Sequence, residues 1–348
     1  MSEPVLRMIK SAAPIRIADL GGWTDTWFAG HGCVLNMGVY PYAEVQILVR
    51  RQAAARPMIT IVAENYGERY TIPKPEGDYN KQPLLEAAID YMRVPPHLSL
   101  EISIFSEAPA GCSTGTSAAV SVALIGALDC LTPGRLTAHE VARAAHRIET
   151  ELLGQQCGIQ DQLASAYGGI NYIDMWAYPH ASVSPIRLPD AMWWELENRL
   201  MLIYVGHAHS SSDVHRKVIA ELESSGPEDA RLTPLRATPG AARDALCAGD
   251  FAGLGAAMVR NTEAQAKLHA ELVGVDHRRI IEIARSHGAA GWKVNGAGGD
   301  GGSVTILTGP ESSTRRAILR DLAGVNPAYR NIPIYLSRHG LRVWEPAG

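Results

Sequence analysis

Pro109-Ala-Gly-Cys-Ser-Thr-Gly-Thr-Ser-Ala-Ala119 is the stretch that decides the fold of this 348-residue chain. Apolar and polar residues alternate over 99–105, which predicts a half-buried strand, and an Ala/Val-rich helix is predicted to begin near Ser117. The first amide groups of a helix have no partner inside it and lie at the positive end of its dipole, so they can bind phosphate. The loop therefore indicates either a phosphate site or an ordinary strand–turn–helix corner.

The side chains of this loop carry the groups that a phosphate site would use. Ser113, Thr114, Thr116 and Ser117 have hydroxyls that can donate to phosphate oxygens or coordinate Mg²⁺. No GxxxxGK[ST] sequence occurs in the chain, so the lysine of the common nucleotide-binding loop is missing. A phosphate site here would depend on backbone amides and hydroxyls.

A second segment, Gly154-Gln-Gln-Cys-Gly-Ile-Gln-Asp-Gln162, follows a helix predicted over 138–153 by a capping-box pattern and by its apolar spacing. Glu149 falls at the end of this helix, where the dipole disfavours an anion unless a cation such as Mg²⁺ offsets it. Asp161 could orient or deprotonate a substrate hydroxyl, as phosphoryl transfer requires. The alternative is a solvated glutamate and a turn aspartate.

A third segment, Lys293-Val-Asn-Gly-Ala-Gly-Gly-Asp-Gly-Gly-Ser303, runs directly into a predicted strand. So many glycines lower local stability, which indicates close approach of the backbone to a ligand or else a flexible hairpin loop. A dinucleotide-binding fingerprint follows a strand and opens a helix, whereas these glycines precede a strand. A dinucleotide-dependent oxidoreductase is therefore not expected.

Composition and charge limit the function classes. The chain has 46% hydrophobic and 20% charged residues, enough for a large core, and its length suggests two domains or one large one. Its net charge of −4 argues against a general nucleic-acid or membrane-surface binder, and its longest apolar run, 118–128, is too short to span a bilayer. There is no apolar signal core at the start, and five scattered cysteines read as reduced thiols, so we expect a cytoplasmic protein.

Strands and helices are mixed without a regular βαβ rhythm, which predicts an α+β fold. The segment 183–190, with two prolines, is predicted to connect two domains, and the Pro/Gly/Ser/Thr-rich stretch 224–240 is predicted to interrupt the helices that follow a strand at 200–205. Further elements are predicted as strands at 44–49, 303–307 and near 334 and 343, and as helices at 83–92 and 312–322.

These segments, in this order, resemble the GHMP small-molecule kinase family, whose phosphate loop reads approximately P-x-G-x-G-L-G-S-S-A-A. The start of the chain, Ala13-Pro14-Ile15-Arg16 followed by Gly21-Gly22-Trp23-Thr24-Asp25, is similar to that of galactokinases, but galactokinases have Glu-His where this chain has Gly22-Trp23. The Gly-Gly-x-[Ser/Thr]-Asp form resembles the fucokinase and heptose kinase branch. Cys157-Gly-Ile-Gln-Asp161 and the glycines of 296–302 resemble the remaining family motifs. In this chain the phosphate loop is residues 109–119, and the residues that match the family pattern are Pro109, Gly111, Gly115, Ser117, Ala118 and Ala119. Three positions differ from the pattern: a Gly is replaced by Ser113, a Leu by Thr114 and a Ser by Thr116.

The resemblance implies a site for ATP and Mg²⁺. Asp161 would act as the base or hydroxyl orienter, and Arg16 would set its ionisation and steady the developing charge. Ser117 and Glu149 would hold Mg²⁺. The residues implied to bind the ATP phosphates are Gly111, Cys112, Ser113, Thr114, Gly115, Thr116 and Ser117, and those implied to bind substrate are Asp25, Gly22, Trp23, Gly298, Gly299 and His209.

Two weaker signals leave alternatives open. His207 and His209 form a His-x-His pair without an evident third ligand, so sugar contact or a helix-capping cluster with Ser212 or Asp213 is favoured over zinc. Trp23 and Trp27 could form an apolar wall for a sugar face or could pack in the core.

The expected architecture has an S5-like domain over 1–190, which contains the phosphate loop, and a ferredoxin-like domain over 191–348, with the active site in the cleft between them. The implied function is ATP-dependent phosphorylation of a sugar, at the anomeric hydroxyl of a heptose-, mannose- or fucose-type sugar or sugar phosphate. A kinase of a non-sugar alcohol such as homoserine or mevalonate, and a non-catalytic sugar sensor, stay open as alternatives. The expected partners are the small-molecule sugar and ATP, with no nucleic acid or membrane, and a homodimer is left open.

Overall fold

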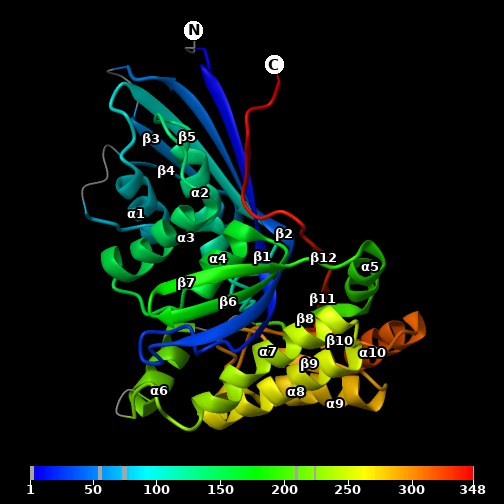
Figure 1. Cartoon of the computed structure of the whole chain (residues 1–348). Coiled ribbons are helices and arrows are strands. Elements are labelled where there is room, and N and C mark those ends of the chain that lie inside the picture. The colour runs from blue at the N-terminus through cyan, green and yellow to red at the C-terminus, as the bar shows by residue number, and fades with distance from the viewer. Residues whose placement is uncertain (1–3, 54–56, 73–76, 208–210, 223–224, 348) are drawn as a thin grey trace.

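Two β-sheets organise the chain, as Figure 1 shows, with the first sheet in the upper part of the view and the second below it. The computed structural model describes residues 4–53, 57–72, 77–207, 211–222 and 225–347. Within these residues helices and strands are mixed without a repeating βαβ order, so the predicted α+β class is confirmed.

The first sheet has nine strands in the described part of the chain, with the central order β13-β1-β2-β5-β3-β4. β2 is 20 residues long, and different parts of it pair with β5 and with β6, so it extends the sheet past the phosphate loop. The strands are β1 (Arg7–Leu20), β2 (Gly32–Arg51), β3 (Ile59–Ala63), β4 (Glu68–Ile72), β5 (Leu98–Ser106), β6 (Ile170–Ala177), β7 (His180–Ile186), β12 (Tyr335–Leu336) and β13 (Arg342–Trp344).

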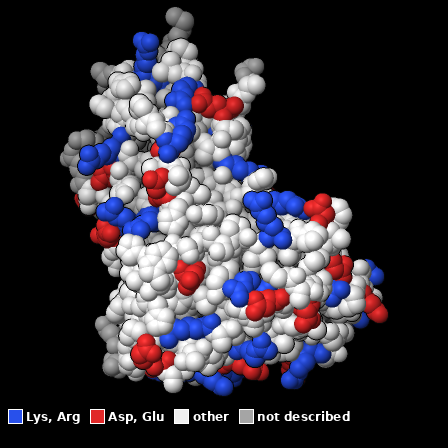
Figure 2. All heavy atoms as spheres, in the orientation of Figure 1, with Lys and Arg blue, Asp and Glu red and all other residues white. Residues whose placement is uncertain are grey.

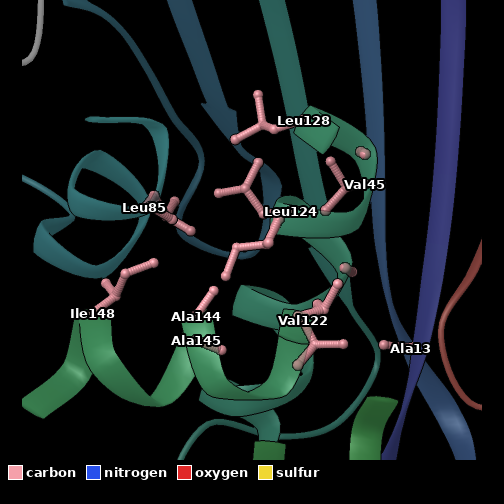
Figure 3. Close-up of a cluster of buried hydrophobic side chains, with 14 of the residues drawn as sticks. Ala13, Val45, Leu85, Val122, Leu124, Leu128, Ala144, Ala145 and Ile148 are labelled. Atoms are coloured by element: carbon pink, nitrogen blue, oxygen red, sulfur yellow. The ribbon is translucent and has the colours of Figure 1, made fainter. Parts of the chain in front are cut away.

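One helix forms the centre of the first core. It is α2 (Thr116–Asp129), which packs on β1 and β2 and is covered by α1 (Pro83–Met92) and α3 (Ala138–Arg147). Figure 3 shows Leu85 of α1 and Ala144 of α3 gathered around Leu124 of α2. Each fully buried leucine contributes about 1.5–3 kcal/mol. The phosphate loop is therefore attached to a helix that the core holds firmly.

The second sheet has the antiparallel order β11-β8-β10-β9. All residues of β8 and β10 are buried, because helices cover this sheet. Its strands are β8 (Leu200–Tyr204), β9 (Gly291–Val294), β10 (Ser303–Leu307) and β11 (Arg330–Ile332), and the later helices are α4 (Gln160–Tyr167), α5 (Asp190–Arg199), α6 (Ser211–Leu222), α7 (Leu232–Ala248), α8 (Phe251–Leu268), α9 (Val275–Ser286) and α10 (Ser312–Val325).

The two ends of the chain meet in the first sheet. β13 pairs with β1, and β12 pairs with β2, so the last strands return to the sheet in which the chain begins. We keep the division into 1–190 and 191–348 as a proposal, with the amendment that residues 335–344 complete the first unit.

Most predicted elements are confirmed, and the segment 183–190 is a correction. Residues 183–186 are the end of β7, and only 187–189 lie between β7 and α5. β7 pairs with β6 alone in the described structure. Because an edge strand does not need every amide for the sheet, it tolerates Pro185.

The interruption predicted over 224–240 is also partly wrong, because α7 begins at Leu232 and continues through Pro239. A proline inside a helix leaves the carbonyl four residues earlier without its usual donor. Here the Thr238 hydroxyl donates to the Leu235 carbonyl oxygen at 2.9 Å, which satisfies that group and lets the helix continue.

The helix predicted over 138–153 has a capping box at Thr137 and Glu140, as predicted, but it changes its winding near the end. α3 stops at Arg147 and a π-helical turn, η2 (Ile148–Leu152), follows it. π-Helical turns are rare in proteins overall, and those that occur are often found at functional sites. Glu149 lies in this turn and is only 6% exposed.

Neither the charged residues on the face drawn in Figure 2 nor the free thiols mark a separate site in the described part of the chain. Basic and acidic residues are interspersed over the face shown in Figure 2. None of the helices in the described residues is long and apolar enough to cross a membrane. The five cysteines are free thiols, and the described residues contain no group of three or more His, Cys, Asp or Glu side chains that could hold a metal ion.

Candidate active site

A cavity of about 730 Å³ opens between the two sheets. Its walls come from the end of β1, the phosphate loop, η2, the start of α4, and the glycine-rich segment before β10. The predicted residues that the structure brings together on this wall are Arg16, Trp23, Asp25, Gly111, Cys112, Ser113, Thr114, Gly115, Thr116, Ser117, Glu149 and Asp161.

Left-handed backbone angles shape the phosphate loop. Gly115, the residue before α2, has a φ of +68°, and a β-carbon there would lie 3.1 Å from an Asp161 carboxylate oxygen. Ser113 has a φ of +60°, so this serine occupies a conformation that favours glycine. The loop is held from both sheets, because the Arg16 amide donates to the Thr114 carbonyl at 2.9 Å and the Ser303 hydroxyl donates to the Cys112 carbonyl at 2.7 Å.

Two features of this loop fit a phosphate group. The first amides of α2 have no partner within the helix, and no side chain caps them. The buried Ser113 hydroxyl oxygen has no hydrogen-bond partner in the described structure. A phosphate oxygen would satisfy both, so ATP fits the residues present.

Asp161 is fixed by Arg16 at the opening of the cavity. Arg16 Nε donates to Asp161 Oδ1 at 2.8 Å and Nη2 donates to Oδ2 at 3.2 Å, which is a two-point pair. Arg16 is 3% exposed, whereas the Asp161 side chain is 28% exposed. The Asp161 carboxylate is thus oriented by the buried Arg16 and is still accessible to a ligand in the cavity.

Glu149 is buried beside this pair. Its Oε1 accepts a hydrogen bond from Gln162 Nε2 at 2.8 Å. Burial, with a contribution from the charge of Asp161, raises the pKa of Glu149 to about 7, although the Gln162 hydrogen bond acts in the opposite direction. A buried carboxylate without a cation fits a divalent metal, so Glu149, with the exposed Ser117 hydroxyl, could hold Mg²⁺.

Asp25 is a second buried carboxylate on the cavity wall, with 2% exposure. Its Oδ2 accepts from the Gln160 amide at 3.1 Å. Burial raises the pKa of Asp25 to about 6, and the charges of Asp161 and Asp19 add to this, against the effect of the Gln160 hydrogen bond. Hydroxyl donors from a ligand would stabilise its ionised form.

Trp23 and the remaining predicted residues differ in how they meet the cavity. Trp23 is buried, packs against Phe28 with ring centroids 6.5 Å apart, and also borders the cavity. It is therefore a core residue, and its contact with a sugar face stays a prediction. Gly22, Gly298 and Gly299 are buried behind the wall, and Gly296 and Ala297 line it in their place. His209 lies outside the described residues.

Sequence reasoning missed several residues on or just behind this wall. Asp19 lies inside the motif that runs from Arg16 to Asp25, and Lys293 is the one charged residue of β9. The sequence did carry a signal for Lys293, because it is a charged residue in an otherwise apolar strand next to a glycine-rich segment. Arg330 on β11 lines the cavity too, but its sequence neighbourhood carries no motif.

Comparison with known proteins identifies the family of this chain. The family described as "GHMP kinases N terminal domain" matches residues 83–169, which include the phosphate loop, η2 and Asp161. The chain is 31% identical over 289 residues to a mevalonate kinase from Thermococcus sibiricus, covering 77% of this chain and 78% of that protein. It is 25% identical over 303 residues to a D-glycero-alpha-D-manno-heptose 7-phosphate kinase from Campylobacter jejuni, covering 85% of this chain and 88% of that protein.

A solved structure shares the whole architecture. A D-glycero-D-manno-heptose 1-phosphate kinase from Bacteroides thetaiotaomicron superposes with a TM-score of 0.75 at 23% identity, covering 98% of this chain and 100% of that one. Both relatives are kinases, and the similarity to them shows that this chain is a kinase. The chain belongs to the GHMP kinase family, whose members use ATP as the phosphate donor.

Proposed function

We propose that this protein is a sugar kinase that transfers the γ-phosphate of ATP to a sugar hydroxyl, in particular the anomeric hydroxyl of a heptose-, mannose- or fucose-type sugar or sugar phosphate. The observation that carries the proposal is the Arg16–Asp161 pair, which faces the same cavity as the phosphate loop and the buried Asp25. A carboxylate at Asp25 suits a polyhydroxyl substrate, because it can accept hydrogen bonds from neighbouring hydroxyls.

In this proposal the phosphate loop holds the triphosphate through the first amides of α2 and through the hydroxyls of Ser113, Thr114, Thr116 and Ser117. Positioning and charge stabilisation supply most of the catalysis of phosphoryl transfer, and little covalent chemistry is required of the protein. Ser117 and Glu149 would hold Mg²⁺, which neutralises charge on the phosphates when bound.

Asp161 orients the attacking hydroxyl and accepts its proton. Arg16 acts at the same point in two ways. Its two-point pair orients the Asp161 carboxylate, and its positive charge steadies negative charge that develops between the hydroxyl and the phosphate. Asp25 holds other hydroxyls of the sugar, so that the reacting one faces Asp161.

Phosphorylation of a non-sugar alcohol is the second candidate, and the 31% identity to a mevalonate kinase favours it. A non-catalytic sensor is the third, and the complete set of carboxylates and loop hydroxyls argues against it. The sugar candidate is supported by the heptose phosphate kinase named above and by Asp25.

An ADP-release screen tests these candidates directly. The purified protein is given ATP and Mg²⁺ with free aldoses, with phosphorylated aldoses, and with mevalonate and homoserine. We expect turnover with an aldose and a product whose ³¹P NMR signal couples to the anomeric proton. Turnover with mevalonate or homoserine and none with sugars would overturn the sugar assignment, and no turnover with any acceptor would favour the sensor.

A further inference from the structure

We propose that Asp19 and Lys293 are positioning residues: they form a buried ion pair between the two sheets that holds Arg16 and Gly296 in the geometry needed for phosphoryl transfer. The proposal rests on the proposed function, because it takes Arg16 and Asp161 as the catalytic pair. It adds two residues, and a link between the two sheets, that the proposed function described above does not include.

Both charges of the pair are almost fully removed from solvent. Asp19 and Lys293 are each 1% exposed, and Lys293 Nζ lies 3.5 Å from Asp19 Oδ1. Lys293 Nζ also donates to Gln265 Oε1 at 2.9 Å and to the carbonyl oxygen of Val294. An ammonium group has three N–H donors, so these three contacts account for all of them.

The same pair fixes the peptide of Gly296 from two sides. The Gly296 amide donates to both carboxylate oxygens of Asp19, each at 3.1 Å. On the other side, Gln265 Nε2 donates to the Gly296 carbonyl oxygen at 3.0 Å. Gly296 has a φ of +57° and lines the cavity. The first turn of the glycine-rich segment is therefore held by β1, by α8 and, through Gln265, by Lys293.

Asp19 also lies behind Arg16. Arg16 Nη1 is 4.0 Å from Asp19 Oδ1, and the same guanidinium makes its two-point pair with Asp161 on the other side. Burial alone would raise the pKa of Asp19, but Lys293 and Arg16 outweigh it and hold this pKa below its ordinary value. Asp19 thus stays ionised, and Lys293 balances its charge so that Arg16 remains directed at Asp161.

Stability alone gives little reason for this arrangement. The desolvation of two buried charges offsets much of their attraction, and apolar replacements of such pairs are often neutral or stabilising. Removing only one partner is costly, because the other charge is then left buried and unpaired. Single substitutions in this pair are therefore expected to cost more than the double substitution, and this difference can be tested.

The experiment compares Asp19→Asn, Lys293→Met and the double variant with the parent protein. Asp129→Asn is the matched control, because Asp129 is also a buried carboxylate that accepts a backbone amide, from Leu136 at 2.9 Å, but it does not line the cavity. For each protein kcat, the KM for ATP and the Tm are measured with the fastest acceptor from the screen, D-glycero-D-manno-heptose 7-phosphate being tested first.

We expect each single variant to lose about 10- to 100-fold in kcat with a KM for ATP within threefold of the parent. The double variant should recover part of this loss, because no buried charge is left unpaired. Asp129→Asn should keep the parental kcat. If a single variant does not fold, the double variant decides: a kcat equal to the parent's overturns the proposal and a reduced kcat supports it.

A purely structural role predicts a different pattern. In that case the Tm falls, but kcat well below the Tm stays within twofold of the parent, and this result overturns the positioning role. Asp161→Asn is measured in the same assay to separate the two proposals. If Asp161→Asn is inactive while the Asp19 and Lys293 variants are normal, only the positioning proposal fails; if Asp161→Asn is fully active, the proposed catalytic pair fails.

Discussion

Two corners of the same cavity differ in whether their buried carboxylates have a cation beside them. At the corner between the sheets, Asp19 is matched by Lys293 and lies next to Arg16. At the corner formed by η2 and the loop after β1, Asp25 and Glu149 are also buried but have no cation within ion-pair distance in the described structure.

The electrostatic result differs accordingly. Cations hold the pKa of Asp19 low, whereas burial raises the pKa of Asp25 to about 6 and that of Glu149 to about 7. The Asp19 carboxylate already has cations beside it and can serve as a rigid support. The carboxylates of Asp25 and Glu149 gain a partner for their charge only when a ligand supplies a cation or hydroxyl donors. We infer that the first corner positions groups and that the second binds ligands.

The largest expected effect comes from Asp161, which links the two corners. Asp161→Asn should lower kcat by about 10²–10⁴-fold, because the variant can neither accept the hydroxyl proton nor pair fully with Arg16. Fold and ATP binding should be nearly unchanged, which the Tm and calorimetric titration of ATP would show. A near-normal kcat in the folded variant would remove Asp161 from the mechanism.

A substitution at Asp25 tests the corner whose carboxylates have no cation beside them, through both substrate binding and pH dependence. Asp25→Asn should raise the KM for sugar about 10- to 150-fold, since a charged acceptor for hydroxyls is worth about 1.5–3 kcal/mol, while the KM for ATP changes little. It should also blur the preference between sugar epimers. If the variant instead loses stability but keeps the parental KM, Asp25 only supports the turn after Gly22.

The same variant has a predicted effect on stability without ligand. The pKa of Asp25 rises from 3.8 in the unfolded chain to about 6 in the fold, so between these values the folded protein holds more protons than the unfolded one. Stability therefore falls as pH rises through this window, by at most about 3 kcal/mol. Asp25→Asn removes this loss, so its Tm relative to the parent should rise between pH 4 and pH 7 and level off above.

Glu149 sharpens the comparison through metal dependence. Glu149→Gln should raise the Mg²⁺ concentration needed for half-maximal kcat about tenfold, because the neutral amide is a weaker ligand for a hard cation. Parallel Mg²⁺ titrations of kcat in the variant and the parent measure this. Glu151→Gln is the control, since Glu151 lies in the same turn but is exposed and paired with Arg147. Identical titration curves for Glu149→Gln and the parent would make Glu149 a structural residue.

The smallest expected effect is at Arg330, which with Arg16 supplies the basic side chains among the described lining residues. Its guanidinium carbon lies 5.3 Å from the centre of the Tyr204 ring, and the side chain is exposed. Arg330→Gln should raise the KM for ATP up to about fivefold, as an exposed charge contributes about 1 kcal/mol or less. Arg243→Gln is the control and should have no effect, because Arg243 is a partly exposed arginine that lies over Tyr172 and is not among the residues that line the cavity.

The sequence predicted the parts of the site that lie in continuous motifs. The strand, loop and helix around Ser117 follow from local periodicity, and the structure has them as β5, the phosphate loop and α2. Family resemblance supplied Arg16, Asp25 and Asp161, and the structure brings all three to one cavity. Their roles stay predictions until the variants above are measured.

The unpredicted parts depend on contacts between distant segments. Asp19 and Lys293 are 274 positions apart, and no local pattern shows that they meet. The continuation of α7 through Pro239 depends on a single hydroxyl of Thr238, and the strand at Pro185 depends on its place at a sheet edge. In each case the tertiary neighbour, and not the local propensity, decides the outcome.

The return of the last strands to the first sheet affects how the protein is made. Lys10 in β1 pairs with Trp344 in β13, and Tyr40 in β2 pairs with Tyr335 in β12. A ribosome releases these partners only after it has translated the whole second sheet and its helices. Until then the edge of β1 has unpaired backbone groups of the kind that recruit other chains. A nascent chain stalled near residue 190 therefore carries the phosphate loop together with an open sheet edge, and this intermediate is the one that a chaperone would have to shield.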